Sequence, residues 1–239
     1  MRSIGVLCAT VLVLPAAAGA QSRPATSATV TAAAPSAAAA SLLERTARLY
    51  TGSRGLRAEF TQRITNPITS SENTSTGSYL QRGPGVFSIA FTRPAGDRIV
   101  SDGKTLWVYV PSATPGQVLK MPVGAGAPGG VDLMGQFFTT PSRKFAVTDG
   151  GLATVNGQSL RKLVLSPRSD MGFTRAVLWV APAGGELKQL EVTEPSGMVR
   201  TLVFGSITTR GAAMPADAFT FTVPRGVTVV DPGAIGRGV

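Results

Sequence analysis

The sequence predicts a mainly β protein in which roughly ten antiparallel strands form one large curved sheet or barrel, with few helices. After residue 55, apolar side chains recur at every second position through most of the chain, which is the period of a half-buried strand. Glycine-containing turn signals separate these runs, and two short stretches instead repeat their apolar residues with helical spacing. About 200 residues share this pattern of alternating apolar residues and turn signals, so a single domain is the simplest interpretation.

The first 20 residues have the layout of a secretory signal peptide. Arg2 precedes an apolar run over residues 4–14, Pro15 ends that run, and Ala18 and Ala20 have the spacing of a cleavage site. The run is shorter than the roughly 20 residues that a membrane-spanning helix needs. We therefore expect residues 1–20 to be removed after export, and the alternative is an uncleaved N-terminal anchor.

Residues 21–40 are rich in Ala, Ser, Thr and Pro and contain no large apolar side chain. Such a segment cannot bury enough surface to offset the entropy lost when the chain is ordered. We expect it to be a flexible tether. The folded domain is then expected over residues 41–232, with a short C-terminal tail at 233–239.

A helix is expected to begin at Ser41, because Ser41 and Glu44 form a capping-box pattern. The apolar stripe that follows has helical spacing and consists of Leu42, Leu43, Thr46, Leu49 and Tyr50. Gly52 and Gly55 are expected to end this helix.

The strands that follow should each bury one alternate set of side chains. The first set is Leu56, Ala58, Phe60, Gln62 and Ile64. A later strand buries Phe87, Ile89 and Phe91, and in the next one Leu106, Val108 and Val110 lie opposite Trp107 and Tyr109. Further strands are expected near residues 117–123, 143–148, 159–166, 175–181, 187–194, 198–209 and 219–229. The turn signals between strands include Asp102-Gly103, Asp149-Gly150-Gly151, Asn156-Gly157, Gly184-Gly185 and Pro195-Ser196-Gly197.

The composition excludes most catalytic chemistry. The chain has no histidine, and its one cysteine, Cys8, lies in the expected signal peptide. These counts exclude Ser-His-Asp and Cys-His nucleophiles, imidazole metal ligands, intramolecular disulfides and multi-cysteine metal centres. Asp97, Asp102 and Asp132 lie near turns or expected helix starts, where capping explains them. We therefore expect a binding protein with no catalytic residue, metal or cofactor.

The net charge is +10, and removal of residues 1–20, which carry one arginine, lowers it to +9. The basic residues are scattered and the chain carries an export signal, so we expect no nucleic-acid partner. Solvated faces of the sheet are the default explanation of the charge. A basic exterior near anionic lipid headgroups or an acidic partner is the alternative.

One stretch interrupts the strands. Residues 124–130 (GAGAPGG) form a Gly/Pro linker, and residues 131–138 (VDLMGQFF) follow it. Leu133, Met134, Phe137 and Phe138 fall on one face at helical spacing. A short apolar helix here either covers the mouth of the curved sheet or simply plugs its core.

Four segments together resemble the LolA family, the periplasmic carriers of outer-membrane lipoproteins. Phe60, Thr61 and Gln62 after an N-terminal helix resemble the first strand of that family. Residues 82–87 (RGPGVF) are similar to its Arg-Pro-x-x-Phe segment, and residues 99–109 (IVSDGKTLWVY) to its most recognisable block. Residues 219–227 (FTFTVPRGV) resemble its C-terminal strand. Order and spacing agree over about 170 residues, nearly the whole expected domain.

The resemblance implies an incomplete, curved antiparallel barrel of about ten to eleven strands, covered by helices that form a lid. It implies a monomeric periplasmic carrier, not an enzyme, whose partners are acylated lipoproteins as cargo, an inner-membrane ABC transporter that supplies them, and an outer-membrane acceptor lipoprotein or the membrane itself. The hydrophobic cavity for acyl chains would be lined by Phe60, Phe87, Ile89, Phe91, Trp107, Leu133, Met134, Phe137 and Phe138. For each of these, ordinary core packing is the alternative.

Arg82 matches the arginine that, in this family, hydrogen-bonds backbone carbonyls of the lid and holds the empty form closed. A planar guanidinium with five donors suits that role better than an ammonium. On this interpretation Arg82→Leu retains cargo but releases it poorly. Gly83 is an insertion relative to the family pattern and could turn Arg82 to the other face of its strand.

Two other functions fit the same features. The chain could bind another lipid or glycolipid of the cell envelope, because a cavity does not distinguish among apolar cargoes. It could also be a regulatory module that senses lipidated ligands, although such modules usually carry a second domain.

Overall fold

The structure is a computed structural model that describes residues 35–123, 131–209, 214–215 and 217–231. The expected signal peptide (1–20), most of the expected tether (21–34), the linker at 124–130 and the tail at 233–239 lie outside the described residues. Within the described part of the chain, no helix has the length and apolar character needed to cross a membrane.

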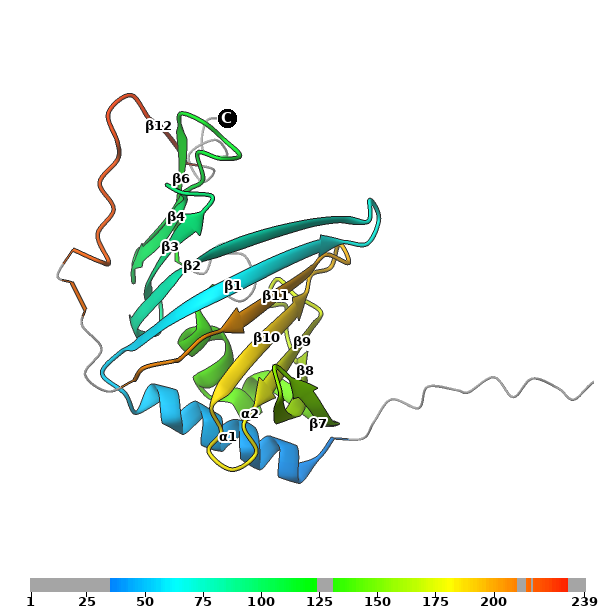
Figure 1. Ribbon diagram of the computed structural model, residues 1–239. Helices are drawn as coiled ribbons and strands as arrows, with labels where there is room; N and C mark the ends of the chain where they lie inside the picture. Colours follow the sequence, from blue (N-terminus) through cyan, green and yellow to red (C-terminus); the bar gives the residue numbers. More distant parts are fainter. Residues whose placement is uncertain (1–34, 124–130, 210–213, 216, 232–239) are drawn as a thin grey trace, which may run out of the picture. The chain divides into compact units, whose positions relative to one another are not determined.

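Twelve strands of the described residues form a single sheet (Figure 1). They are β1 (Leu56–Asn66), β2 (Ser71–Gly83), β3 (Val86–Arg93), β4 (Arg98–Asp102), β5 (Thr105–Tyr109), β6 (Gln117–Pro122), β7 (Phe145–Val155), β8 (Gln158–Pro167), β9 (Arg175–Val180), β10 (Leu187–Thr193), β11 (Val199–Phe204) and β12 (Thr228–Val230). Three helical elements accompany them: α1 (Ala37–Thr51), the π-helical turn η1 (Met134–Phe138) and α2 (Pro141–Lys144).

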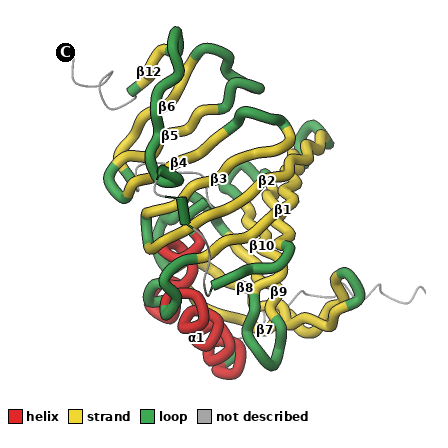
Figure 2. Tube along the Cα trace, turned by 60° about the vertical axis from the view of Figure 1, so that its left-hand side comes forward, coloured by secondary structure: helices red, strands yellow, loops and turns green. Residues whose placement is uncertain are grey.

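The sheet is curved and open. The order of its strands is β12-β6-β5-β4-β3-β2-β1-β11-β10-β9-β8-β7, and the end strands β12 and β7 do not pair with each other, so no barrel closes. Figure 2 follows this succession from β12 to β7, with α1 beside the β7 half. All pairs are antiparallel except β12 with β6. The expectation of a mainly β, incomplete curved sheet with few helices is confirmed.

The strand β1 has the predicted alternation, with Leu56, Ala58, Phe60 and Gln62 buried and the side chains between them exposed. It joins the two halves of the sheet, because it pairs with β2 on one side and with β11 on the other. Phe60 lies opposite Phe204 of β11 in this register. Side chains that are distant in sequence therefore face one concave surface.

The first helix begins earlier than expected. It starts at Ala37, with Ser36 as N-cap, so residues 37–40 belong to the helix and not to a tether. The Ser36 hydroxyl oxygen accepts a hydrogen bond from the Ala39 amide at 3.2 Å, and the Ser36 amide donates to the Val147 carbonyl at 2.9 Å. Alanine has the highest helix propensity, so a serine ahead of an alanine run is the better start. The end at Gly52 is as expected.

Two predicted strand boundaries are wrong. Asp149-Gly150-Gly151 is not a turn between strands but a β-bulge within β7, which continues to Val155. Residues 219–227 contain no strand, and the C-terminal strand is only Thr228–Val230. The aromatic side chains of that segment, which gave it a strand-like alternation, instead pack on the sheet: Phe221 stacks on Trp107 at 5.4 Å between ring centroids.

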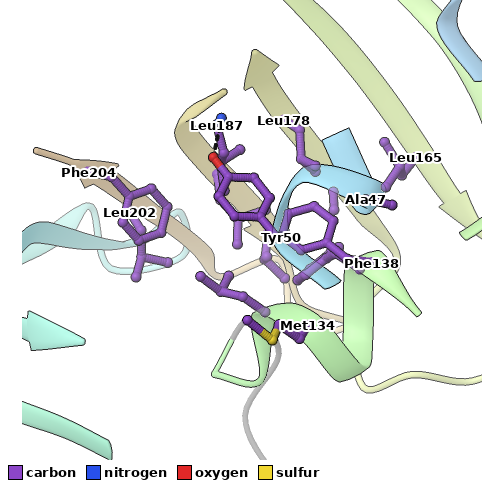
Figure 3. Packing of buried hydrophobic residues seen from close by; sticks show 14 of the residues in the cluster. Ala47, Tyr50, Met134, Phe138, Leu165, Leu178, Leu187, Leu202 and Phe204 are labelled. Carbon is purple, nitrogen blue, oxygen red and sulfur yellow. Dashed lines mark hydrogen bonds between the residues drawn. The ribbon is translucent and has the colours of Figure 1, made fainter. Parts of the chain in front are cut away.

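The core lies between the concave face of the sheet and the helical elements. Tyr50 of α1 is at its centre, stacked on Phe138 with ring centroids 4.9 Å apart (Figure 3). The Tyr50 hydroxyl oxygen accepts a hydrogen bond from the Leu187 amide at 2.8 Å, which ties α1 to β10. Burial of the ring raises the pKa of Tyr50 from 10.0 to about 12.

This raised pKa predicts an alkaline loss of stability. Between pH 10 and 12 the unfolded chain loses the Tyr50 proton while the folded chain keeps it, so the free energy of unfolding falls as pH rises. Two pKa units correspond to about 3 kcal/mol. Urea unfolding at pH 8 and pH 11.5 should show a smaller loss in Tyr50→Phe than in the unsubstituted protein. Equal losses in the two proteins would contradict the burial of this hydroxyl.

Candidate functional site

A narrow, mostly apolar pocket with about 20 Å³ of free volume lies on the concave face. Its walls come from β1, β2, β3, β4 and β11 and from the segment before η1. The lining residues are Phe60, Gln62, Tyr79, Ile89, Phe91, Ile99, Val131, Leu133, Arg200, Leu202 and Phe204. This volume holds about one water molecule, so the pocket is closed to a larger ligand in this form.

Residues 131–138, which we call the covering segment, close this pocket on the side away from the sheet. Its apolar side chains Leu133, Met134, Phe137 and Phe138 are all at most 2% exposed. Phe137 packs against Phe145 and Phe173, with ring centroids 6.0 and 5.6 Å apart. The segment therefore contacts both the first strands, through the pocket wall, and the later strands, through these aromatic rings.

A buried polar network attaches the covering segment to β2. Gln81, which is fully buried, accepts hydrogen bonds at Oε1 from the Met134 amide (3.0 Å) and the Tyr79 hydroxyl (2.6 Å). The Tyr79 hydroxyl oxygen in turn accepts from the Leu133 amide at 3.2 Å. The Gln81 amide nitrogen donates to the Asp132 carboxylate. One glutamine thus holds the start of η1 through both its donor and its acceptor.

Asp132 fixes the other end of this network. Its Oδ1 accepts from the Gly135 amide at 2.8 Å, which caps the turn, and its Oδ2 accepts from the Gly85 amide at 2.9 Å. Lys144 donates to the Gly135 carbonyl, and partial burial lowers the pKa of this lysine. The predicted capping role of Asp132 is confirmed, and its carboxylate also ties the covering segment to the β2–β3 turn.

Arg82 does not make the contacts expected of it. The pairing of β2 with β3 shifts between Gln81 and Gly83, so Arg82 is the extra residue of a β-bulge. Its side chain is exposed and its guanidinium carbon lies 4.7 Å from the centre of the Phe219 ring. The alternation of β2 puts Gln81 inside and Arg82 outside. Arg82 borders a hollow together with Met134 and Phe138, but the hydrogen bonds to the covering segment come from Gln81, one residue earlier.

We accordingly expect Arg82→Leu to have a small effect. Loss of an exposed cation–π contact costs roughly 0.5–1 kcal/mol, and the bonds to the covering segment remain. Urea unfolding should give a change in this range, and the release of a bound lipid to acceptor membranes should be unchanged. Impaired release in this variant would show that Arg82 does hold the empty form closed.

Trp107 is also placed differently from the expectation. It lies in β5 opposite Val100 of β4, on the face away from the core, while its neighbour Leu106 points into the core. There it stacks on Phe221 and carries the Lys120 ammonium 5.4 Å from its ring centre. Alternation along a strand puts Trp107 and Leu106 on opposite faces, so Trp107 cannot line the pocket.

The remaining predicted residues lie on the concave side. Phe60, Ile89, Phe91 and Leu133 line the pocket, and Phe87, Met134, Phe137 and Phe138 are buried in the core beside it. Arg200, Leu202 and Phe204 were missed, although alternation in β11 indicates them: if Leu202 and Phe204 point inward, so does Arg200. Tyr79 and Gln81 alternate inward along β2 in the same way.

Of the other two predicted acidic residues, Asp102 has the turn role expected of it. Asp102 accepts from the Lys104 and Thr105 amides, each at 2.8 Å, and these bonds lower the pKa of its carboxyl. Asp97 is buried and does not cap its own turn, because it accepts from the amide and the hydroxyl of Ser112, fifteen residues later. In the described residues no three acidic, cysteine or histidine side chains come together as a metal site would require.

An open, curved sheet whose apolar concave face is covered by a helical segment is suited to binding or carrying apolar ligands. Residues 51–124 match the sequence model of the outer membrane lipoprotein carrier protein LolA. The chain is 32% identical to an outer-membrane lipoprotein carrier protein of Methylibium petroleiphilum over 73% of its own length and 81% of the relative's. It is 29% identical to a protein of the same name from Chromobacterium violaceum, over 81% and 89% of the two chains.

The chain therefore belongs to the outer-membrane lipoprotein carrier family, as its sequence suggested. Among solved structures, an uncharacterized conserved protein from Thermus thermophilus is similar in fold, with a TM-score of 0.51 at 15% identity. That match covers 81% of this chain and 98% of the other.

Proposed function

We propose that the protein is a periplasmic carrier that accepts acylated lipoproteins from an inner-membrane ABC transporter, shields their acyl chains under the covering segment and delivers them to the outer membrane. Membership of the carrier family supports this proposal, and the expected signal peptide supports export. The observation that carries it is the apolar pocket between the concave face and the covering segment.

A soluble carrier is needed because acyl chains are costly to expose to water. Each buried methylene is worth roughly 0.8 kcal/mol, so a chain of about sixteen carbons represents roughly 12 kcal/mol. A pocket with about 20 Å³ of free volume is too small for even one such chain. Cargo binding therefore requires the covering segment to move aside, which exposes the apolar faces of Leu133, Met134 and Phe137 to the cargo.

Release follows from the return of the covering segment. In the empty protein, the Gln81 and Asp132 hydrogen bonds and the Phe137 cluster favour the closed form. Cargo binds the open form, so the free energy of closing is a penalty on binding. If the closed form is only moderately stable, the penalty is small enough for cargo to bind at the inner membrane and large enough for cargo to be released at the outer membrane.

Depletion of the protein in its own bacterium is the test of this function. Lipoproteins held in the inner membrane would support it, whereas a defect confined to one glycolipid would support lipid transport of another kind. In vitro, the purified protein should release a radiolabelled lipoprotein from inner-membrane vesicles with ATP and hold it as a soluble complex.

A matched pair of variants links that activity to the pocket. Phe91→Asp places a charge at the partly exposed edge of the pocket and should abolish the soluble complex. Leu152→Asp makes the same kind of change at a side chain that is 59% exposed on β7 and should leave the complex intact. Equal activity in both variants would argue against the pocket as the cargo site.

A further inference from the structure

One wall of the apolar pocket carries a charged side chain. Arg200 of β11 lies opposite Ile64 of β1 in the sheet register, and its alternation with Leu202 and Phe204 directs it to the concave face. Its side chain is only 15% exposed. An arginine is costly to bury in an apolar wall unless its donors are used.

The donors of Arg200 are only partly used. One terminal nitrogen donates to the Gln62 side-chain oxygen at 3.0 Å, and the other lies 3.4 Å from the Glu194 carboxylate. The Gln62 amide nitrogen donates to the Ser75 hydroxyl at 3.1 Å. The Nε–H group of Arg200 is buried and has no hydrogen-bond partner among the described residues.

This arrangement defines the chemistry of a suitable ligand group. An unused N–H beside an apolar pocket suits an oxygen acceptor that is attached to hydrocarbon. The Glu194 carboxylate already balances the charge of the guanidinium, so a neutral acceptor fits without leaving a second charge unpaired. An ester carbonyl oxygen meets both conditions, because in an acyl glyceride it lies at the head of the acyl chain.

We propose that Arg200 is a cargo-recognition residue, whose Nε–H donates to an ester carbonyl of an acyl-glyceryl group while the acyl chain occupies the pocket that opens when the covering segment moves aside. This rests on the proposed function, since it assumes acylated cargo. It adds that the site recognises the ester bond between the acyl chain and the glycerol. The site therefore distinguishes an acyl ester from a hydrocarbon chain of the same length.

The test compares two diacylglyceryl lipopeptides with the same sixteen-carbon chains, one with ester linkages and one with ether linkages, which lack the carbonyl oxygens. Affinities are measured by displacement of a fluorescent fatty acid. We expect the unsubstituted protein to bind the ester at least about tenfold more tightly, the effect of a hydrogen bond to a charged donor. Arg200→Met should bind both lipopeptides with similar affinity.

Two further variants separate recognition from loss of structure. The double variant Arg200→Met/Glu194→Gln removes the ion pair as a unit, leaves no unpaired carboxylate and should also lose the preference. Arg63→Met, an exposed arginine on the opposite side of β1 that pairs with Glu72, should keep it. Circular dichroism and urea unfolding identify any variant that fails to fold.

The outcomes are distinct. If the unsubstituted protein binds both lipopeptides equally, or if both Arg200 variants keep the ester preference, the recognition role of Arg200 is wrong while acyl-chain binding stands. If the unsubstituted protein binds neither lipopeptide, the proposed function itself fails. Tighter binding of an anionic phospholipid than of the ester lipopeptide would overturn the choice of a neutral acceptor.

Discussion

Gln81→Leu should hold its cargo and release it poorly. The substitution removes the acceptor of the Met134 amide and the donor to the Asp132 carboxylate, so the closed form loses about 3 kcal/mol. Because the cargo competes with closure, its apparent affinity should rise by about a hundredfold. Transfer of a labelled lipoprotein to acceptor vesicles should slow accordingly, while formation of the soluble complex is retained.

Native-state hydrogen exchange provides a structural measurement of the same change. The Leu133 and Met134 amides, which donate to Tyr79 and Gln81, should exchange about a hundredfold faster in the variant. Gln158→Leu, at an exposed position in β8, is the control and should alter neither exchange nor transfer. Unchanged protection of the Met134 amide in Gln81→Leu would mean that the network does not hold the covering segment.

Phe137→Ala should cause the largest loss of stability. Phe137 is fully buried between Phe145 and Phe173, and truncation of such a ring costs roughly 3–5 kcal/mol through lost burial and the cavity left behind. The midpoint of urea unfolding should fall with little change in slope. Domains of this size have total stabilities of about 5–15 kcal/mol, so the variant keeps a small margin at 25 °C.

A half-buried ring provides the matched control. Phe221→Ala removes the same atoms from the opposite face of the sheet, where the ring stacks on Trp107 and remains partly exposed. Its cost should be clearly smaller, because less area leaves water on folding. A loss below about 1 kcal/mol in Phe137→Ala would contradict a packed aromatic cluster at this position.

The architecture could be predicted from the sequence because its signal is local. The period-two pattern of Leu56, Ala58, Phe60 and Gln62 specifies both a strand and its buried face. The same rule applied to β5 puts Leu106 in the core and Trp107 on the outer face. The expectation that Trp107 lines the cavity was therefore inconsistent with the alternation of its own strand. The segment at 219–227 also alternates, but its aromatic side chains pack on the outer face of the sheet and do not belong to a strand.

The polar part of the site could not be predicted, because it depends on tertiary contacts. Gln81 alternates inward with Tyr79, but this pattern does not show that its hydrogen-bond partners lie in residues 131–138. The hydrogen bonds of Gln81 reach Asp132 and Met134, which are about fifty residues away along the chain. An arginine in a strand, such as Arg200, is by default expected to face solvent. Only its alternation with the inward-facing Leu202 and Phe204 of β11 indicates that it is buried.

The place of β1 between the two halves of the sheet bears on how the chain folds. Strands β1 to β6 pair with their sequence neighbours, as do β7 to β11, so each half can form by local hairpins. The pairing of β1 with β11 is different, because it joins strands that are distant in sequence. Gln62 of β1 and Arg200 of β11, which are hydrogen-bonded, are 138 residues apart. Contacts of such sequence separation form slowly because a long loop must close first. We expect the two halves to form early. The shared concave surface, with its pocket, should form only when β1 pairs with β11.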